Sequence, residues 1–231
     1  MVFPKQVNTI LLILFLFFFI YESKGASYSS GSHTGVHGDD TTALPNVKVN
    51  LSVYYGSLCQ SCAVFIIKDL ENIFYNGLIS IVNLQLVPWA NAYVNNTNNS
   101  ISCQNGPEEC KLNSLESCVL NLYPNVDTQY AVIVCLEFMA IDGRFNRWND
   151  CLNQLDLPKQ PILNCLKRGN GIELGKKYIN ETAQLYPPPS LLPWVVVNNE
   201  PIGNDYANVT YYVCKAYRGV AVPEACNLHL K

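Results

Sequence analysis

The sequence is poor in histidine, and its few histidines lie near the two ends of the chain. They are His33, His37 and His229, so that two precede the first predicted strand and one is third from the C-terminus. A Ser-His-Asp triad, a Cys-His pair and a histidine-ligated zinc site each need a histidine inside the folded core. The positions of these histidines argue against all three kinds of chemistry.

Charged residues are also scarce, at 14% of 231 residues, against roughly 25% in an average soluble domain. The 15 basic and 18 acidic side chains give a formal net charge of −3, and there is no long run of lysine or arginine. Nucleic-acid binding depends on basic side chains that neutralise phosphates, so we expect no nucleic-acid partner. The hydrophobic fraction of 49% is sufficient for a substantial core.

Long apolar segments are limited to one run near the N-terminus. Lys5 precedes an unbroken apolar stretch from Ile10 to Ile20, which the small residues Ser23 and Gly25 follow. This order is typical of a secretory signal peptide, which we place at residues 1–25. A membrane-spanning helix needs roughly 20 apolar residues, more than this run offers, so we expect no membrane anchor.

Ten cysteines follow this segment, an even number in a chain that we expect to be exported. They are Cys59, Cys62, Cys103, Cys110, Cys118, Cys135, Cys151, Cys165, Cys214 and Cys226. Such a set in an exported protein predicts a framework of disulfide bonds, although the sequence leaves most of the pairing open. Glycosylation sequons agree with export. They begin at Asn50, Asn95, Asn98, Asn180 and Asn208.

The expected domain opens with a strand–helix–strand unit. Residues 26–45, rich in Gly, Ser, Thr and His, are interpreted as a flexible leader to a domain over residues 46–231. Residues 47–55 alternate apolar with polar side chains and predict a strand. Helical spacing of apolar residues follows from Cys62 to Gly77, and residues 81–87 predict a second strand. This βαβ order favours a parallel pair of strands.

A helical insertion is expected over about residues 95–170, which hold six of the ten cysteines. Residues 112–122 and 128–141 have helical patterns there, and we expect disulfides to staple the region. Further elements are predicted after it: a helix over 171–185, a strand over 194–198 and a closing helix over 209–217.

The motif Cys59-Gln60-Ser61-Cys62 lies between the first strand and its helix. The N-terminus of a helix carries unpaired N–H groups and the positive end of the helix dipole. Both lower the pKa of a thiol placed there and make its sulfur nucleophilic. Cys62, one turn further on, can attack a mixed disulfide formed by Cys59. Thiol–disulfide exchange needs such a pair, so we predict that Cys59 attacks and Cys62 resolves.

Two other interpretations of this motif stay open. A zinc site would need a second cysteine pair or a nearby histidine, and the sequence has neither. A purely structural Cys59–Cys62 disulfide fits an exported protein, but so short a loop constrains little chain and adds little stability.

Two motifs together resemble the gamma-interferon-inducible lysosomal thiol reductase family. The first is YYGSLCQSC over residues 54–62, and the second is CQNGPEECKLN over residues 103–113. The second matches the family signature C-Q-x-G-x-x-E-C followed by an asparagine. The resemblance covers about residues 47–226 and includes matches at residues 87–92, 133–135 and 193–198 and at the late cysteines.

The resemblance implies an α/β, thioredoxin-like fold with a disulfide-stapled helical insertion. It also implies reduction of protein disulfides, with Cys59 as the nucleophile and Cys62 as the resolving thiol. Cys103 and Cys110 are interpreted as structural disulfide partners, and we expect structural disulfides for the later cysteines too. In thioredoxin-like folds a cis-proline before a core strand lies against the cysteines and helps to bind substrate. Pro193 has this position.

We therefore expect a disulfide reductase that acts on disulfide-containing proteins and needs no metal or organic cofactor. A small-molecule or protein thiol would serve as reductant, in the secretory pathway or after delivery outside the cell or to a lysosomal or vacuolar lumen. Two alternatives remain: a disulfide oxidase or isomerase with the same site, and a secreted, non-catalytic binding module on a thioredoxin-like scaffold.

Overall fold

The computed structural model describes residues 48–229 except Asn96, Asn98 and Asn99. The expected signal peptide, the leader and the sequon residue Asn98 lie outside the described residues. Within the described part of the chain, no helix is both long and apolar enough to cross a membrane.

A central sheet carries the site. Four strands of the described residues form it in the order β2-β1-β5-β6. They are β1 (Val49–Tyr54), β2 (Val82–Val87), β5 (Trp194–Val197) and β6 (Glu200–Pro201). The β1–β2 pair is parallel, as the βαβ order favoured, whereas β1–β5 and β5–β6 are antiparallel.

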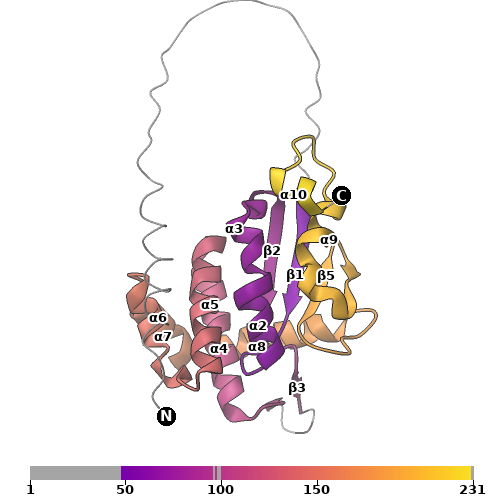
Figure 1. The fold of residues 1–231 in the computed structure, drawn as a ribbon. Helices are drawn as coiled ribbons and strands as arrows, with labels where there is room; N and C mark the ends of the chain where they lie inside the picture. The colour runs from indigo at the N-terminus through magenta and orange to yellow at the C-terminus, as the bar shows by residue number, and fades with distance from the viewer. Residues whose placement is uncertain (1–47, 96, 98–99, 230–231) are drawn as a thin grey trace, which may run out of the picture. The chain divides into compact units, whose positions relative to one another are not determined.

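Both faces of this sheet are covered, which explains why the four residues of β5 are all buried. On one face Val53 and Val195 belong to a core with Phe65 from the first helical segment and Val213 from α9 (Val209–Ala216). On the other face, side chains of alternate strand residues pack against Tyr178 of α8 (Asn170–Ala183). Figure 1 shows the first helical segment and α9 in front of the strands.

The crossover between β1 and β2 is a single helical segment with a widened turn in its middle. It consists of α2 (Gln60–Val64), the π-helical turn η1 (Phe65–Asp69) and α3 (Glu71–Tyr75). The Leu70 N–H donates to the Phe65 carbonyl oxygen at 2.9 Å, one residue further back than in an α-helix. Gly77, at φ 68°, ends the segment before the short η2 (Leu78–Ile81).

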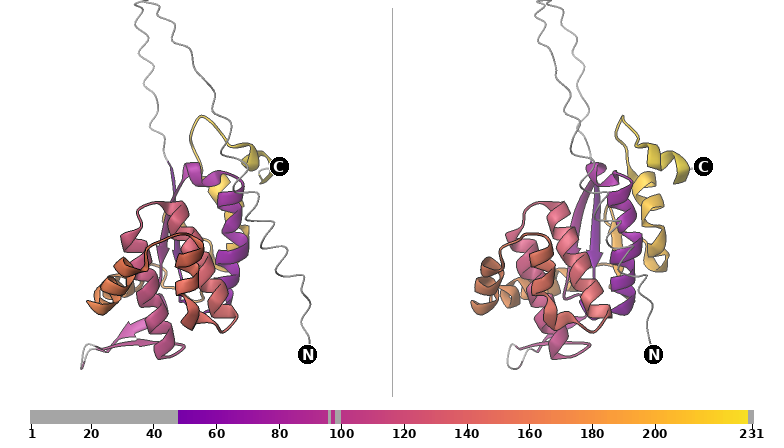
Figure 2. Two further views of the ribbon diagram at one scale, coloured as in Figure 1. Left: turned by 90° about the vertical axis from the view of Figure 1, so that its left-hand side faces the viewer. Right: turned by 60° about the vertical axis from the view of Figure 1, so that its left-hand side comes forward.

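The helical region lies beside the strand–helix core in all views (Figure 1 and Figure 2). Its elements before α8 are α4 (Pro107–Leu122), α5 (Val126–Ile141), η3 (Phe145–Arg147), α6 (Asn149–Gln154) and α7 (Lys159–Lys167). The helix α4 begins five residues before the predicted start because Pro107 occupies its first position, directly after Gly106 at φ 92°. The short helices α6 and α7 and the hairpin of β3 (Ala92–Val94) and β4 (Ile101–Cys103) were not predicted.

All ten cysteines lie in the described part and form disulfides there. Cys118 of α4 is bonded to Cys165 of α7, and Cys135 of α5 to Cys151 of α6. These two bonds fasten the short helices to the long ones. The remaining bonds are Cys59–Cys62, Cys103–Cys110 and Cys214–Cys226, the last of which ties α9 to α10 (Glu224–His229).

Gly175 of α8 is expected to be intolerant of alanine, although alanine usually stabilises a helix interior by about 1 kcal/mol over glycine. A Cβ at this position would lie 2.6 Å from Cε2 of the fully buried Trp89. We expect Gly175→Ala to lower the free energy of unfolding by about 1–3 kcal/mol in urea denaturation. Lys177→Ala, an exposed site on the same helix, is the control, and equal effects of the two changes would contradict the close packing.

Candidate active site

Cys59 lies where the first helical segment begins, at the N-cap of α2. Its Sγ accepts a hydrogen bond from the Cys62 N–H at 3.2 Å, so the sulfur faces the unpaired backbone donors of the first turn. Cys59 is partly exposed, whereas Cys62 is completely buried. The two sulfurs form a disulfide in this structure. Only the first of them is placed for contact with another molecule.

The segment before Pro193 is held directly against the motif. The Ser61 hydroxyl donates to the Leu192 carbonyl oxygen at 2.8 Å, and its oxygen lies 3.3 Å from Cys59 Sγ. The Leu192–Pro193 peptide bond is cis. The sequence analysis assigns Pro193 and the Cys59–Cys62 motif to one site. The structure places these two segments in contact, although Ser61 and Leu192 are 131 residues apart.

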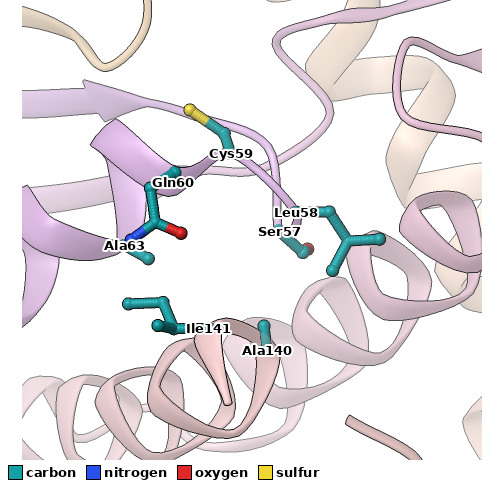
Figure 3. A pocket seen from close by; sticks show the side chains of 7 residues that line it. All are labelled: Ser57, Leu58, Cys59, Gln60, Ala63, Ala140 and Ile141. Carbon is teal, nitrogen blue, oxygen red and sulfur yellow. The ribbon is translucent and has the colours of Figure 1, made fainter. Parts of the chain in front are cut away.

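A groove runs past Cys59 between the motif and this proline segment. Its walls come from residues 58–61, from Ala90 and Asn91, from Gln104 and Asn105, and from residues 189–192. None of these described lining residues carries a charge. On the other side of the motif, a smaller hollow separates it from Ala140 and Ile141 of α5, as Figure 3 shows. The groove therefore offers amide, hydroxyl, backbone and leucine contacts beside an exposed sulfur.

The second sequence motif supports the loop that carries Cys59. Glu109 is fully buried, and its Oε1 accepts from the amides of Asn91 at 2.7 Å and Asn105 at 2.9 Å. Its Oε2 accepts from the Asn105 N–H at 2.8 Å. The Asn105 amide also donates to the Leu58 carbonyl oxygen at 3.4 Å. One buried carboxylate thus fixes two groove residues and, through Asn105, the residue before Cys59.

Asn113 also supports the loop that carries Cys59, through hydrogen bonds with Ser57. Its Oδ1 accepts from both the N–H and the hydroxyl of Ser57, at 3.0 and 2.7 Å, and all of these groups are buried. Its Nδ2 lies 3.9 Å from Cys103 Sγ, in the Cys103–Cys110 disulfide. These contacts place Asn113 and the Cys103–Cys110 disulfide next to the loop that carries Cys59.

Asn113→Ala should therefore damage both stability and activity. It leaves a buried N–H and a buried hydroxyl of Ser57 without their acceptor, at a cost of about 1–3 kcal/mol for each group. We expect the free energy of unfolding to fall by about 2–4 kcal/mol in urea denaturation and disulfide reduction to slow at least about tenfold. Asn164→Ala, at an exposed position of α7, is the control. Equal stability of the two variants would contradict this role.

The described sequon residues are not among those that line the groove. Asn50 is exposed in β1, and its Oδ1 accepts from the Asn83 amide at 3.0 Å. Asn95, Asn180 and Asn208 are also exposed. No cluster of potential metal ligands occurs in the residues that the structure describes.

Buried acidic residues are the part of this region that the sequence analysis missed. Glu109, Glu116 and Glu137 are all at most 1% exposed. A signal was available for Glu137, which is the lone charged residue of the apolar stretch AVIVCLEFMAI over residues 131–141. Such a stretch predicts a buried helix, in which an unpaired charge is unusual.

Comparisons with known proteins agree with this geometry. The family model described as "Gamma interferon inducible lysosomal thiol reductase (GILT)" matches residues 50–155. A "Gamma-interferon-responsive lysosomal thiol protein" of Arabidopsis thaliana is 35% identical over 201 residues, covering 82% of this chain and 80% of the relative. A "Gamma-interferon-inducible lysosomal thiol reductase" of Mus musculus is 32% identical over 187 residues, covering 79% and 73%.

Solved structures show the same fold at low sequence identity. The reduced form of the disulfide bond oxidoreductase DsbG from Mycobacterium tuberculosis matches with a TM-score of 0.55 at 12% identity, covering 86% of this chain and 90% of that one. DsbA from Chlamydia trachomatis matches with a TM-score of 0.54 at 14% identity, covering 78% and 95%.

These findings confirm the thioredoxin-like fold and the thiol–disulfide oxidoreductase activity predicted from the sequence. The enzyme is a disulfide reductase. With relatives more than 30% identical over most of its length, the chain belongs to the gamma interferon inducible lysosomal thiol reductase family.

Proposed function

We propose that this protein reduces disulfides of protein substrates with Cys59 as the attacking sulfur. The observation that carries the proposal is the partly exposed Cys59 Sγ at the helix N-cap, which accepts a hydrogen bond from the Cys62 N–H and borders an uncharged groove. Backbone N–H groups at this position stabilise a thiolate more than a thiol. The groove gives an extended substrate segment a place beside that sulfur.

The exchange proceeds in two steps from the reduced enzyme. The Cys59 thiolate attacks one sulfur of the substrate disulfide, which forms a mixed disulfide and releases the other substrate sulfur as a thiolate that takes up a proton. Cys62 then loses its proton and attacks Cys59 Sγ, which releases the second substrate sulfur. Two electrons pass from the enzyme to the substrate, and the enzyme is left with the Cys59–Cys62 disulfide. Two equivalents of an external small-molecule or protein thiol regenerate the dithiol.

Pro193 is assigned to substrate positioning. Its preceding residues form one wall of the groove, and the Ser61–Leu192 hydrogen bond fixes that wall relative to Cys59. A substrate segment in the groove would lie between this wall and Gln104 and Asn105.

Reduction of insulin tests the proposal against its rivals. We expect the wild type, supplied with excess thiol, to reduce insulin disulfides and Cys59→Ser to be slower by at least about 10³-fold. Equal, negligible rates in the two proteins would favour a non-catalytic binding module. The reduction potential of the Cys59–Cys62 pair separates a reductase from an oxidase or isomerase, because an oxidase requires a less negative value.

Residues 46–231 are proposed to act in the lumen of a lysosome or vacuole, or outside the cell, after removal of residues 1–25. The lysosomal names of the relatives and the exposed sequon residues Asn95, Asn180 and Asn208 support this location. N-terminal sequencing of the secreted or organellar protein and its mobility after deglycosylation test both points. A retained N-terminus or an unchanged mobility would count against export.

A further inference from the structure

Two buried carboxyl groups that the exchange steps do not use lie beneath the active-site loop. Glu116 extends from α4 and is 1% exposed, and Glu137 extends from α5 and is fully buried. Glu137 precedes Ala140 and Ile141 by one helical turn, so it shares their face of α5. In Figure 3 Ala140 and Ile141 face the segment from Ser57 to Ala63.

The two carboxyl groups interact with each other, and three of their four oxygens have no hydrogen-bond partner in the described chain. No donor of the described chain makes a hydrogen bond of ordinary geometry with Glu116 Oε2 or with either oxygen of Glu137. The other groups that influence the pKa values of the pair are Tyr55, Ser57 and Glu109. Tyr178 in turn influences the pKa of Tyr55. Within the described residues, no lysine or arginine is among them.

Two bare carboxylates are very costly in such a place, because both side chains are shielded from bulk solvent and, within the described residues, no lysine or arginine is among the groups that act on them. Burial raises the pKa of Glu116 to about 7, while the nearby polar groups of Tyr55, Glu137 and Ser57 limit the rise. Burial and the neighbouring Glu116 charge raise the pKa of Glu137 well above its ordinary value. At acid pH both side chains are therefore neutral, and on raising the pH the pair shares one proton before it loses both.

Ser57 connects this pair to the reactive sulfur. Its hydroxyl has a single proton, which it donates to Asn113 Oδ1 at 2.7 Å. A neutral Glu116 leaves that bond intact, whereas an ionised Glu116 competes for the same proton. Ser57 belongs to the turn that the Cys59 N–H closes by donating to the Gly56 carbonyl oxygen at 3.2 Å. Ionisation of the pair would therefore disturb the Gly56–Cys59 turn, which positions Cys59.

We propose that Glu116 and Glu137 are positioning residues whose retained protons keep the Gly56–Cys59 turn, and with it the Cys59 sulfur, in the reactive arrangement. The inference rests on the proposed function of Cys59. Under this proposal the active-site turn keeps its reactive arrangement at acid pH, whatever the pKa of the Cys59 thiol.

The sign of the pH dependence follows from proton linkage. A carboxyl group whose pKa is higher in the folded than in the unfolded protein contributes stability that is complete below the unfolded value, near 4.5. That stability is lost as the pH rises through the folded value. For Glu116 the loss occurs between about pH 4.5 and 7, and the raised pKa of Glu137 adds a loss in the same direction.

Thermal unfolding of the oxidised protein tests the pair without any need for catalysis. We expect the wild-type unfolding temperature to fall by about 5–10 °C from pH 4.5 to pH 7.5. Glutamine resembles a protonated glutamate, so the double variant Glu116→Gln/Glu137→Gln should lose at least about half of that fall. Glu173→Gln, at an exposed site of α8, should keep it. Parallel curves for wild type and double variant, or a double variant unfolded at pH 4.5, would overturn the proposal.

A second readout separates positioning from mere packing. The ratio of double-variant to wild-type kcat/KM for insulin reduction should be near one at pH 4.5 and rise at least about threefold by pH 7.5, because only the wild type ionises there. A ratio that is constant with pH would overturn the positioning role. If neither protein reduces insulin at any pH, the proposed function fails, while the unfolding curves still test the proton-holding pair.

Discussion

Replacing Cys62 with serine should convert the enzyme into a trap that stays covalently bonded to its substrate. Cys59 remains at the helix N-cap and can still attack, but the buried sulfur that we propose resolves the mixed disulfide is gone. Because an intramolecular attack is far faster than attack by a free thiol, the lifetime of the mixed disulfide should lengthen by at least about 10³-fold. Incubation of reduced Cys62→Ser with a denatured, disulfide-containing protein, followed by non-reducing electrophoresis and mass spectrometry, would reveal the complex.

Cys59→Ser is the matched control for this experiment. It keeps one cysteine of the motif, but that cysteine is fully buried, so no complex should form. Trapping by Cys59→Ser and not by Cys62→Ser would exchange the two roles, and trapping by neither would remove the covalent mechanism.

Removal of the Cys118–Cys165 disulfide should cause the largest loss of stability among the disulfides outside the motif. Its partners are 47 residues apart, which corresponds to about 4 kcal/mol of chain entropy in the unfolded state. The bond also anchors α7 to α4, the helix that carries Asn113 and Glu116. We expect Cys118→Ala/Cys165→Ala to lower the free energy of unfolding by about this amount in urea denaturation.

The Cys214–Cys226 bond provides a control of similar burial and shorter loop. Its partners are 12 residues apart and at most 4% exposed, and the same entropy argument gives about 3 kcal/mol. The Cys118–Cys165 variant should therefore unfold at a lower urea concentration than Cys214→Ala/Cys226→Ala. The reverse order would show that loop length does not set the contribution of these bonds.

The reactive motif and its βαβ setting were predictable because their signals are local. Alternation in β1, helical spacing after Cys62 and the left-handed Gly77 each act over a few residues, and together they place Cys59 at a helix start. The helix α4 begins earlier than the spacing of its apolar residues predicts, because Pro107 occupies its first turn. The helices α6 and α7 are only six and nine residues long, and disulfides from distant cysteines fix them.

The support of the site was not predictable, because its partners meet only in the folded chain. Ser57 and Asn113 are 56 residues apart, and Asn91 reaches Glu109 from a separate loop. In the sequence Glu116 looks like an ordinary surface residue of a helix, yet it is buried against Glu137 of the next helix. The spacing of apolar residues predicts which face of a helix is buried. It does not predict which polar residue on that face finds a hydrogen-bond partner in another part of the chain.

The central claim is that the helix N-terminus holds the Cys59 sulfur as a thiolate within reach of other molecules. The most direct test is the rate of alkylation of the reduced protein as a function of pH, with the modified cysteine identified by peptide mass spectrometry. We expect Cys59 to react first, with an inflection at least about one unit below the 8.5 of a free thiol. An inflection near 8.5, or modification of Cys62 before Cys59, would contradict the account.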